Sequence, residues 1–600
     1  MSSKYGKLLS VIFACLVICS LLSSSLIVPV HAGDQESDGT AANNVYIPLA
    51  ASNDGTVAAQ QGQSDQIAPE EQVVNAASVY TAKTAVMAAP AAAAALPWTN
   101  LAPVLTNEQL AQAEAAVAHT HLAGPAIKAT GLAPLAAQAL ANSESTVSVS
   151  LEQSAVEPSI GPHAPSDPQL YRNVAPVTTS GTKSTVLEAS VAEGGKYAFY
   201  TGNWFAARST NGGASWTYIN PYSDMSDFCC DQVTLYDEAR DMILWYRQGV
   251  ANASGVNRFR LGISTDGGAT FCNYDVSPTN TNSAWTGQWW DYPHLQLGAN
   301  FVYIASNMFN AAGSGTRTVM LRFPLDSLRS CAGFNYNYYA DPNWFTFVPV
   351  QGADHIMYFA SNWPNTAPQN SRLNIWQWSE NSTSLTSVTK TVAAWSTGAA
   401  TCGSTTGNWA ARSDMRLLTG ARYMIHGNNA QTPGRKVIGW WWNVGQGGSF
   451  ARPYIEAAAF YEDTLAQVSG AQGRPYVWNS SICFLFPSAA ANKRGDLGLV
   501  LNEGTGTNLN PSVDFGIADD YVGVPPGWSL SRVQTSNARP SNNGWGDYNT
   551  VRPFYPSNDA WIGGAHYIAS TTNCSNCGVP IFFVFGRSRD YYSWARWQGN

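Results

Sequence analysis

The chain has 600 residues, of which 45% are hydrophobic and only 12% are charged, with 51 Gly, 22 Trp and 27 Tyr. An average soluble chain has about 25% charged residues, so this composition favours an extracellular all-β protein over a cytosolic helical enzyme. The net charge of −8 and the lack of any run of Lys and Arg argue against nucleic acid as a partner.

The first 32 residues are predicted to be a signal peptide. Lys4 and Lys7 precede an apolar stretch that begins at Leu8, and Val30-His31-Ala32 places small residues where a signal peptidase reads them. Cleavage there would give a secreted protein with no membrane span. The alternative is an uncleaved membrane anchor, because the apolar stretch is nearly long enough to cross a bilayer.

The cysteines indicate disulfides. Removal of the signal peptide leaves an even number, which in an exported chain favours disulfide bonds: Cys229, Cys230, Cys272, Cys331, Cys402, Cys483, Cys574 and Cys577. The sequence does not reveal which cysteines pair. We expect the adjacent Cys229 and Cys230 to bond to separate partners, and Cys574-Ser-Asn-Cys577 to be a structural disulfide and not a zinc or redox half-site.

Composition divides the exported chain near residue 165. Residues 33–165 are rich in Ala, Ser, Gln and Pro, with few aromatic side chains, so they bury too little apolar surface to offset chain entropy. We predict that this leader is mostly disordered. From residue 166 to residue 600, short apolar stretches such as Met242-Ile-Leu-Trp-Tyr246 are separated by Gly, Asn, Asp and Pro, which predicts strands joined by turns.

The strands recur in a repeat of roughly sixty residues. Each unit begins with an acidic residue and continues into an apolar segment, a small polar turn and a second apolar segment; the acids are Glu188, Asp231, Asp291, Asp354, Asp414 and Asp547. A wider gap between the last two implies a further unit that starts near Asn479. Units of four short strands fit an all-β, seven-bladed β-propeller, with six blades as the alternative.

Two octapeptides predict tight hairpin turns in which a polar side chain bonds turn backbone, glycines accept positive φ and an aromatic residue packs into the sheet. They are Ser209-Thr-Asn-Gly-Gly-Ala-Ser-Trp216 and Ser264-Thr-Asp-Gly-Gly-Ala-Thr-Phe271. These octapeptides resemble the Asp-box (BNR) repeats of sialidase-like β-propellers, although one copy has Asn in place of Asp. The resemblance covers roughly residues 180–600 at the level of fold. It implies structural roles for Ser209, Asn211, Gly213, Trp216, Ser264, Asp266, Gly268 and Phe271.

The resemblance also implies an active site that this sequence matches only in part. Sialidases of that family hold the substrate carboxylate with three arginines, which offer planar, bidentate donors. They use an Asp as acid/base and a Tyr assisted by Glu as nucleophile. No Arg-Ile-Pro element precedes the first octapeptide, so the first arginine has no assignable position. Arg208, Arg260 and Arg412 are most simply solvated strand arginines.

Asp547 and Tyr548, followed by Arg552, form the most distinctive polar cluster of the sequence. A carboxylate, a phenol and a guanidinium at a strand entrance would bind a sugar or assist proton transfer, with Asp547 and Tyr548 as the candidate catalytic residues. Buried structural hydrogen bonds are the alternative. Two carboxylates acting as a glycosidase pair would be a further possibility.

The acids that open the repeats would gather at one mouth of the channel if they start innermost strands. Glu188, Asp231, Asp291, Asp354 and Asp414, with Arg552, are therefore candidate binding residues. Such close like charges would raise one another's pKa unless arginines, backbone N–H groups or a bound Ca²⁺ compensated them. No loop has the dense acidic spacing of a calcium site, so we predict no metal and no cofactor.

Trp289-Trp290 and Trp440-Trp441-Trp442 would either stack on sugars or pack between sheets, and core packing is the expected role. The sequence thus predicts a secreted Asp-box propeller that recognises glycans or cell-surface glycoconjugates. A sialidase-like exo-glycosidase that hydrolyses terminal sugars is the alternative, and a structural extracellular scaffold is the third reading. Whether the protein is an enzyme is left open by the sequence.

Overall fold

The computed structural model describes residues 57–58, 77–103, 168–177, 188–364, 370–403, 407–425, 434–519, 528–540, 545–555, 557, 559–571 and 574–591. The chain divides into two units, Met1–Ala51 and Ser52–Asn600, and every described residue belongs to the second. The predicted signal peptide therefore lies outside the described residues, as does most of the predicted leader. No helix among the described residues is long and apolar enough to cross a bilayer.

The described chain is nearly all β, as the sequence predicts. Its helices are single short turns: α2 (Pro278–Thr281), α3 (Leu325–Arg329), and the 3₁₀ turns η1 (Pro221–Ser223), η2 (Gly470–Gly473) and η3 (Ser588–Asp590). Strand β11 (Met242–Gly249), which contains the apolar run from Met242 to Tyr246, is buried at every position. A strand that is buried on both faces has other sheets packed against each face, which explains why its residues do not alternate with polar ones.

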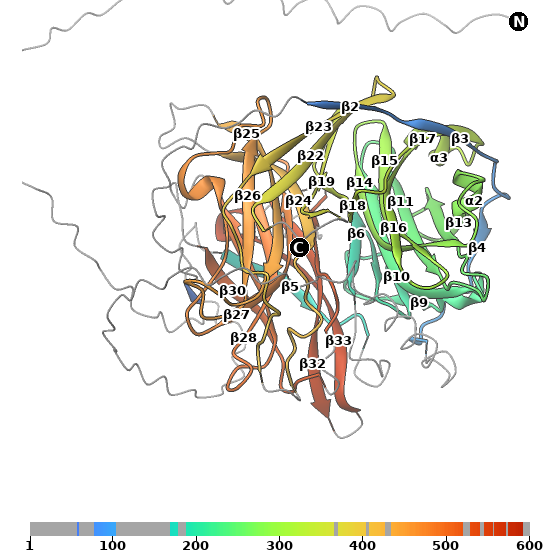
Figure 1. Cartoon of the computed structure of the whole chain (residues 1–600). Coiled ribbons are helices and arrows are strands. Elements are labelled where there is room, and N and C mark those ends of the chain that lie inside the picture. Colours follow the sequence, from blue (N-terminus) through green and yellow to red (C-terminus); the bar gives the residue numbers. More distant parts are fainter. Residues whose placement is uncertain are drawn as a thin grey trace, which may run out of the picture. The chain divides into compact units, whose positions relative to one another are not determined.

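The strands form antiparallel meanders in which successive strands pair (Figure 1). The first three meanders are β6 (Ser190–Gly194), β7 (Tyr197–Thr201), β8 (Ala206–Ser209) and β9 (Thr217–Ile219); β10 (Phe228–Asp237), β11, β12 (Phe259–Ser264) and β13 (Thr270–Val276); and β14 (Gln288–Leu297), β15 (Phe301–Asn310), β16 (Gly315–Pro324) and β17 (Phe334–Asp341).

The next meanders share one continuous sheet, because β19 and β24 form a short parallel pairing. They are β19 (Val348–Gln351), β20 (Ile356–Ser361), β22 (Arg372–Ser379) and β23 (Ser384–Thr391), followed by β24 (Leu417–Ile425), β25 (Arg435–Val444) and β26 (Tyr454–Tyr461). A small separate ribbon joins β18 (Trp344–Phe345) to β21 (Trp363–Pro364). The following meander comprises β27 (Cys483–Ala491), β28 (Leu497–Gly504), β29 (Ser512–Ala518) and β30 (Ser529–Thr535).

The last sheet combines the two ends of the described fold. Strands β31 (Thr550–Pro553), β32 (Trp561–Thr571) and β33 (Cys574–Arg587) are completed by β5 (Pro168–Val174), which pairs antiparallel with β33. The first strand of each meander contacts the first strand of the next, in the order β6, β10, β14, β19, β24, β27 and β31, and β31 contacts β6. The sheets are therefore joined in a closed cycle.

Part of the predicted leader forms strands. In Figure 1 the blue segment that carries β2 (Ser78–Thr81), β3 (Lys83–Met87) and β4 (Ala94–Ala95) runs along the outer strands of the fold. Strand β2 pairs with β23, β3 with β17 and β4 with β13, while β1 (Val57–Ala58) pairs with β30. Thr99 then bridges to Tyr218 in β9. This segment, which we call the outer belt, departs from the low order expected for residues 33–165. Its backbone pairs with sheet edges, and such pairing needs no large side chains.

The adjacent cysteines correct one expectation. Cys229 and Cys230 are bonded to each other and not to separate partners. Cys272 bonds to Cys331 and Cys402 to Cys483, and Cys577 is also disulfide-bonded. The repeat pattern does not predict the disulfide between Cys229 and Cys230, because this pairing depends on the local backbone at the start of β10.

The predicted turn chemistry is present in both octapeptides. Asp266 Oδ1 accepts hydrogen bonds from the backbone N–H groups of Ala269 and Thr270, each at 2.9 Å. Asn211 Oδ1 accepts one from the backbone N–H of Ser215 at 2.9 Å. Gly213 and Gly268 each have a φ of +85°, a conformation that glycine adopts without steric cost. These turns lie between β8 and β9 and between β12 and β13.

The tryptophan pair and the tryptophan triplet are core residues, as expected. Trp290, Trp440, Trp441 and Trp442 are fully buried, and Trp289 is 9% exposed. The exposed large hydrophobic side chains among the described residues are Val79, Val86, Leu101, Val250 and Ile356. This set contains no aromatic residue.

Candidate active site

The candidate site lies near irregularities in strand pairing at the N-terminal part of β10 and within β14. The pairing register of β10 with β11 shifts between Phe228 and Gln232, and that of β14 with β15 shifts between Asp291 and His294. A register shift of this kind bends the strand and redirects side chains. Asp231 and Asp291 lie in or beside these shifts, and the Cys229–Cys230 disulfide immediately precedes Asp231.

Four carboxyl groups from distant parts of the sequence meet here: Glu188, Asp231, Asp291 and Asp547. All are buried, with exposed fractions from 1% for Asp291 to 6% for Asp547. The backbone N–H of Asp547 donates to Glu188 Oε1 at 3.2 Å. The carboxyl of Asp231 is hydrogen-bonded to that of Glu188 and is influenced by the charges of Asp291 and Asp547. We call these residues the acidic cluster.

Asn203 holds Glu188 in place through two further hydrogen bonds. Asn203 Nδ2 donates to Glu188 Oε2 at 2.8 Å, and the backbone N–H of Glu188 donates to Asn203 Oδ1 at 2.6 Å. Asn203 is itself fully buried. These two contacts fix both the backbone and the carboxyl group of Glu188.

The other carboxyls of the cluster favour their protonated forms. Burial raises the pKa of Asp547 to about 7, against the opposing effect of the Arg416 charge. Burial also raises the pKa of Asp291 to about 7, with the Tyr292 backbone and Arg416 opposing the rise. The pKa of Asp231 is raised well above its ordinary value, first by burial and then by the charge of Glu188. Burial therefore favours retained protons on Asp231, Asp291 and Asp547 near neutral pH.

Arg416 supplies the positive charge of the site. It is 7% exposed, and its Nε donates to Asp414 Oδ2 at 2.5 Å. Its guanidinium carbon lies 3.9 Å from the ring centre of Tyr292, a cation–π arrangement. Neighbouring acids raise the pKa of Arg416 in spite of its burial. Sequence reasoning missed Arg416; its position two residues after Asp414 was the available signal.

Two tyrosines complete the site. The ring centres of Tyr292 and Tyr548 are 6.4 Å apart. The Tyr548 hydroxyl is buried and has no hydrogen-bond partner among the described residues. Burial and the charge of Asp231 raise its pKa well above 10. Tyr548 is therefore a neutral phenol with an unused donor.

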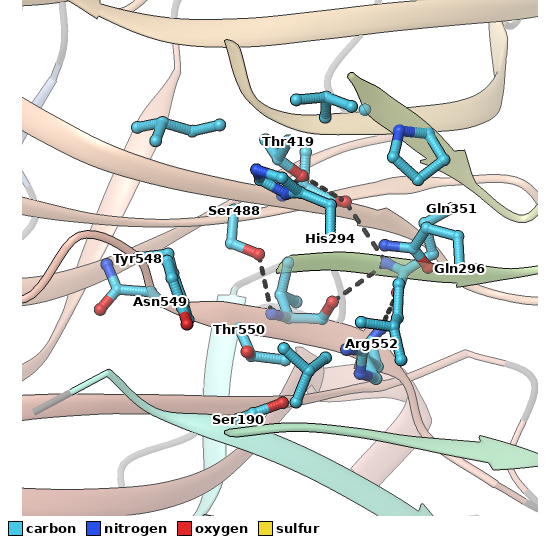
Figure 2. Close-up of a pocket in the computed structure, with 18 of the residues that line it drawn as sticks. Ser190, His294, Gln296, Gln351, Thr419, Ser488, Tyr548, Asn549, Thr550 and Arg552 are labelled. Carbon is cyan, nitrogen blue, oxygen red and sulfur yellow. Dashed lines mark hydrogen bonds between the residues drawn. The ribbon is translucent and has the colours of Figure 1, made fainter. Parts of the chain in front are cut away.

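A cavity of about 60 Å³ lies beside Tyr548 and extends along the first strands. Every first strand contributes to its wall: Ser190 from β6, Val233 from β10, His294 from β14, Gln351 from β19, Thr419 from β24, Ser488 from β27 and Thr550 from β31. Figure 2 shows His294, Tyr548, Gln351 and Arg552 around this space. Burial lowers the pKa of His294 to about 3, so its imidazole is neutral.

Several residues singled out in the sequence do not join the cluster. Asp354 lies in the turn between β19 and β20, and its side chain is 56% exposed near His355. The expectation that it opens a first strand is wrong, because the apolar segment that follows it is the second strand, β20. Asp414 is partly exposed and joins the site as the ion-pair partner of Arg416.

The arginines singled out in the sequence do not converge on one group. Arg552 lies in β31, where its Nε donates to the backbone oxygen of Val191 at 2.9 Å. Arg208 bonds backbone oxygens of the 264–271 turn, and Arg260 pairs with Asp275. Arg412 influences the pKa of Asp547. Arg208 and Arg260 therefore bind partners outside the acidic cluster, so the three arginines do not form one carboxylate-binding triad.

The structure describes no arrangement of three or more His, Cys, Asp or Glu side chains that would hold a metal ion. The predictions of no metal and no cofactor remain predictions. No protein-family model matches the chain, and no curated protein matches it.

Several solved structures are similar to the chain at low identity. An α-L-arabinanase of Penicillium chrysogenum complexed with arabinobiose is 8% identical with a TM-score of 0.33, over 69% of this chain and 98% of that one. The GH93 α-L-arabinofuranosidase of Fusarium graminearum with arabinobiose is 8% identical with a TM-score of 0.35, over 70% and 98%. A Trypanosoma rangeli sialidase in complex with 2,3-difluorosialic acid is 8% identical with a TM-score of 0.29, over 61% and 54%. Such low identities and scores support no argument about activity or substrate.

Proposed function

We propose that the described unit is a seven-bladed β-propeller of a secreted protein. The closed cycle of first strands supports this architecture, with β5 completing the sheet of β31 to β33. Export is supported by the signal-like segment at residues 1–32 and by the disulfides. In this architecture the first strands surround a central channel, and the acidic cluster lies toward the end at which they begin.

We further propose that the protein is a glycoside hydrolase, with the acidic cluster as its active site. The observation that carries this proposal is the contrast between two carboxyls of the cluster: burial raises the pKa of Asp547 to about 7, while the Glu188 carboxyl accepts hydrogen bonds from Asn203 and from the Asp547 backbone. Glycoside hydrolysis requires one carboxyl that donates a proton and one that acts as a base or nucleophile. Environments that separate the pKa values of neighbouring acids provide that pair.

The remaining side chains then have definite roles. Asp547 protonates the leaving-group oxygen, and Glu188 acts as the base or nucleophile on the sugar. The Tyr548 hydroxyl, which has no partner among the described residues, donates to a sugar oxygen. The positive charge of Arg416 limits the rise in the pKa values of Asp547 and Asp291. Its guanidinium also orients the ring of Tyr292. The class of substrate is an extracellular glycan with a terminal sugar, as the Asp-box resemblance implies.

The test combines release of sugar from a panel of fluorogenic glycosides with binding to a glycan array. We expect the wild-type protein to turn over at least one glycoside. Asp547→Asn, which keeps the size of the side chain, should lower kcat by about a hundredfold or more. Asp354→Asn is the matched control, because it removes an exposed carboxyl outside the cluster, and it should leave turnover unchanged.

The other outcomes separate the alternatives. Glycan binding without turnover would replace hydrolysis with recognition as the function. Absence of both sugar release and glycan binding would favour a structural extracellular scaffold as the function. Equal turnover by Asp547→Asn and the wild type would contradict the assignment of the acidic cluster as the active site.

A further inference from the structure

A second cavity, of about 220 Å³, lies toward the opposite ends of the first strands. Its wall is made by residues at the ends of these strands and in the turns that follow them: Glu193, Asp237, Leu297, Gly352, Ala491 and Pro553. The acidic cluster, in contrast, lies toward the starts of the same strands. The cavity is thus separate from the candidate active site, and it is large enough for a small molecule because one water occupies about 30 Å³ of liquid.

Arg552 lies between the two cavities and lines both. Its Nη1 donates to Gln351 Oε1 at 2.8 Å, which links β31 to β19 (Figure 2). Gln351 Nε2 in turn donates to the backbone oxygen of Val551 at 3.0 Å. These contacts fix the guanidinium in one orientation, and they use neutral acceptors only.

The charge of Arg552 is not balanced by a carboxylate among the described residues. The acidic side chains at this end have their own cations: Asp237 pairs with Arg240 at 3.1 Å, and Glu238 pairs with Lys493. Burial lowers the pKa of Arg552 to about 10, so the side chain remains charged at neutral pH. Arg552 is half-buried, and a charge partly withdrawn from water without a counter-ion is costly, which makes such a site receptive to an anion.

Glu193, a buried ionisable side chain in the wall of this cavity, is compatible with a bound anion. It is 1% exposed, and neither of its carboxyl oxygens has a hydrogen-bond partner among the described residues. Burial raises its pKa well above the ordinary value, against the opposing charge of Arg172, and so favours the protonated form. A protonated carboxyl adds no repulsion and provides an O–H donor.

We propose that this cavity binds a small oxyanion, a carboxylate or a phosphate, with Arg552 as its charge partner and Glu193 as an additional donor. A guanidinium suits both groups because its planar N–H donors match the oxygens of either. The site is distinct from the acidic cluster and independent of the proposed hydrolysis.

The test is calorimetric titration of the wild-type protein with sodium acetate and, separately, with inorganic phosphate, at ionic strength held constant with sodium chloride. We expect saturable binding of at least one of the two, and the comparison tells a carboxylate site from a phosphate site. Arg552→Gln should weaken binding by tenfold or more. Arg552→Lys keeps the positive charge but loses the paired N–H donors of the guanidinium group, so it should weaken binding by less. Arg435→Gln, which removes a surface arginine paired with Asp463, is the matched control and should bind as the wild type does.

Asp547→Asn should also bind the anion normally, because it alters only the candidate active site. Absence of saturable binding of both anions by the wild type would overturn the proposal, whatever the folding of the variants. Equal binding by Arg552→Gln and the wild type would overturn it as well.

Discussion

The backbone N–H of Asp547 donates a hydrogen bond to Oε1 of Glu188, a residue 359 positions earlier in the chain. Glu188 precedes β6, which begins the first meander, and Asp547 precedes β31, which begins the last. This hydrogen bond therefore joins the two ends of the cycle of sheets. Two members of the acidic cluster are therefore in contact at the point where the cycle of sheets closes.

Asn203 is expected to be a positioning residue for Glu188. Asn203→Ala removes a 2.8 Å hydrogen bond to a buried carboxylate and should lower the free energy of unfolding by about 2 kcal/mol. It should also lower kcat by about tenfold and shift the pH profile of kcat, because the Glu188 carboxyl loses a hydrogen-bond donor. Urea unfolding and steady-state kinetics measure these effects. Asn492→Ala, which removes a 3.1 Å bond to the buried Asp496 carboxylate elsewhere, should cost similar stability and leave the pH profile unchanged.

The pH dependence of stability should change in Asp547→Asn. Burial raises the pKa of Asp547 to about 7 in the folded protein, from about 3.9 in the unfolded chain. The folded state then binds more protons than the unfolded state between these values, so Asp547 lowers stability progressively as pH rises through them. The Asn variant mimics the protonated form. Its stability relative to the wild type should grow from about pH 4 to about pH 7, by an amount on the order of a few kcal/mol, and stay constant above.

Free energies of unfolding measured in urea at several pH values provide the check. A parallel pH dependence in both proteins would show that Asp547 is not shifted by burial. The catalytic counterpart is a loss of wild-type turnover above about pH 7, as the proton donor ionises.

The outer belt should protect sheet edges. A mature chain that begins at residue 104 lacks β2, β3 and β4, and it exposes the outer edges of β23, β17 and β13. Unpaired strand edges associate with other chains. We expect a lower melting temperature and concentration-dependent association in light scattering. A chain that begins at residue 77 retains these strands and should behave as the full mature chain. Monomeric behaviour of both truncations at the wild-type melting temperature would contradict this role.

The disulfides should differ in their contribution to stability. Cys402 and Cys483 close a loop of 81 residues, and chain entropy gives such a bond about 4 kcal/mol. Cys402→Ser combined with Cys483→Ser should lower the unfolding free energy by about that amount. Cys229→Ser combined with Cys230→Ser opens no long loop, so it should cost little stability and act mainly on turnover through the neighbouring Asp231. Similar losses of stability for both pairs would contradict the loop-entropy argument.

The strands and their turns were largely predictable from the sequence. The run from Met242 to Tyr246 indicated a buried strand, and the Ser264–Phe271 octapeptide indicated the turn between β12 and β13. Asp354 shows where this reasoning fails. The first strand of its meander is the short Val348–Gln351, whose Pro weakens the strand pattern. The stronger apolar segment after Asp354 was therefore mistaken for the first strand.

The sequence by itself determined the all-β character, the aromatic core and the chemistry of the tight turns, because these follow from backbone periodicity and interactions between near neighbours. Only the tertiary structure decided that Arg416 enters the acidic cluster, that Asp354 stays outside it, and that an alanine-rich segment pairs with the outer strands. These outcomes depend on strand register and on cyclic closure over hundreds of residues, which no local pattern encodes. The raised pKa values of Asp291 and Asp547 depend on them too, because burial exists only once the sheets have packed.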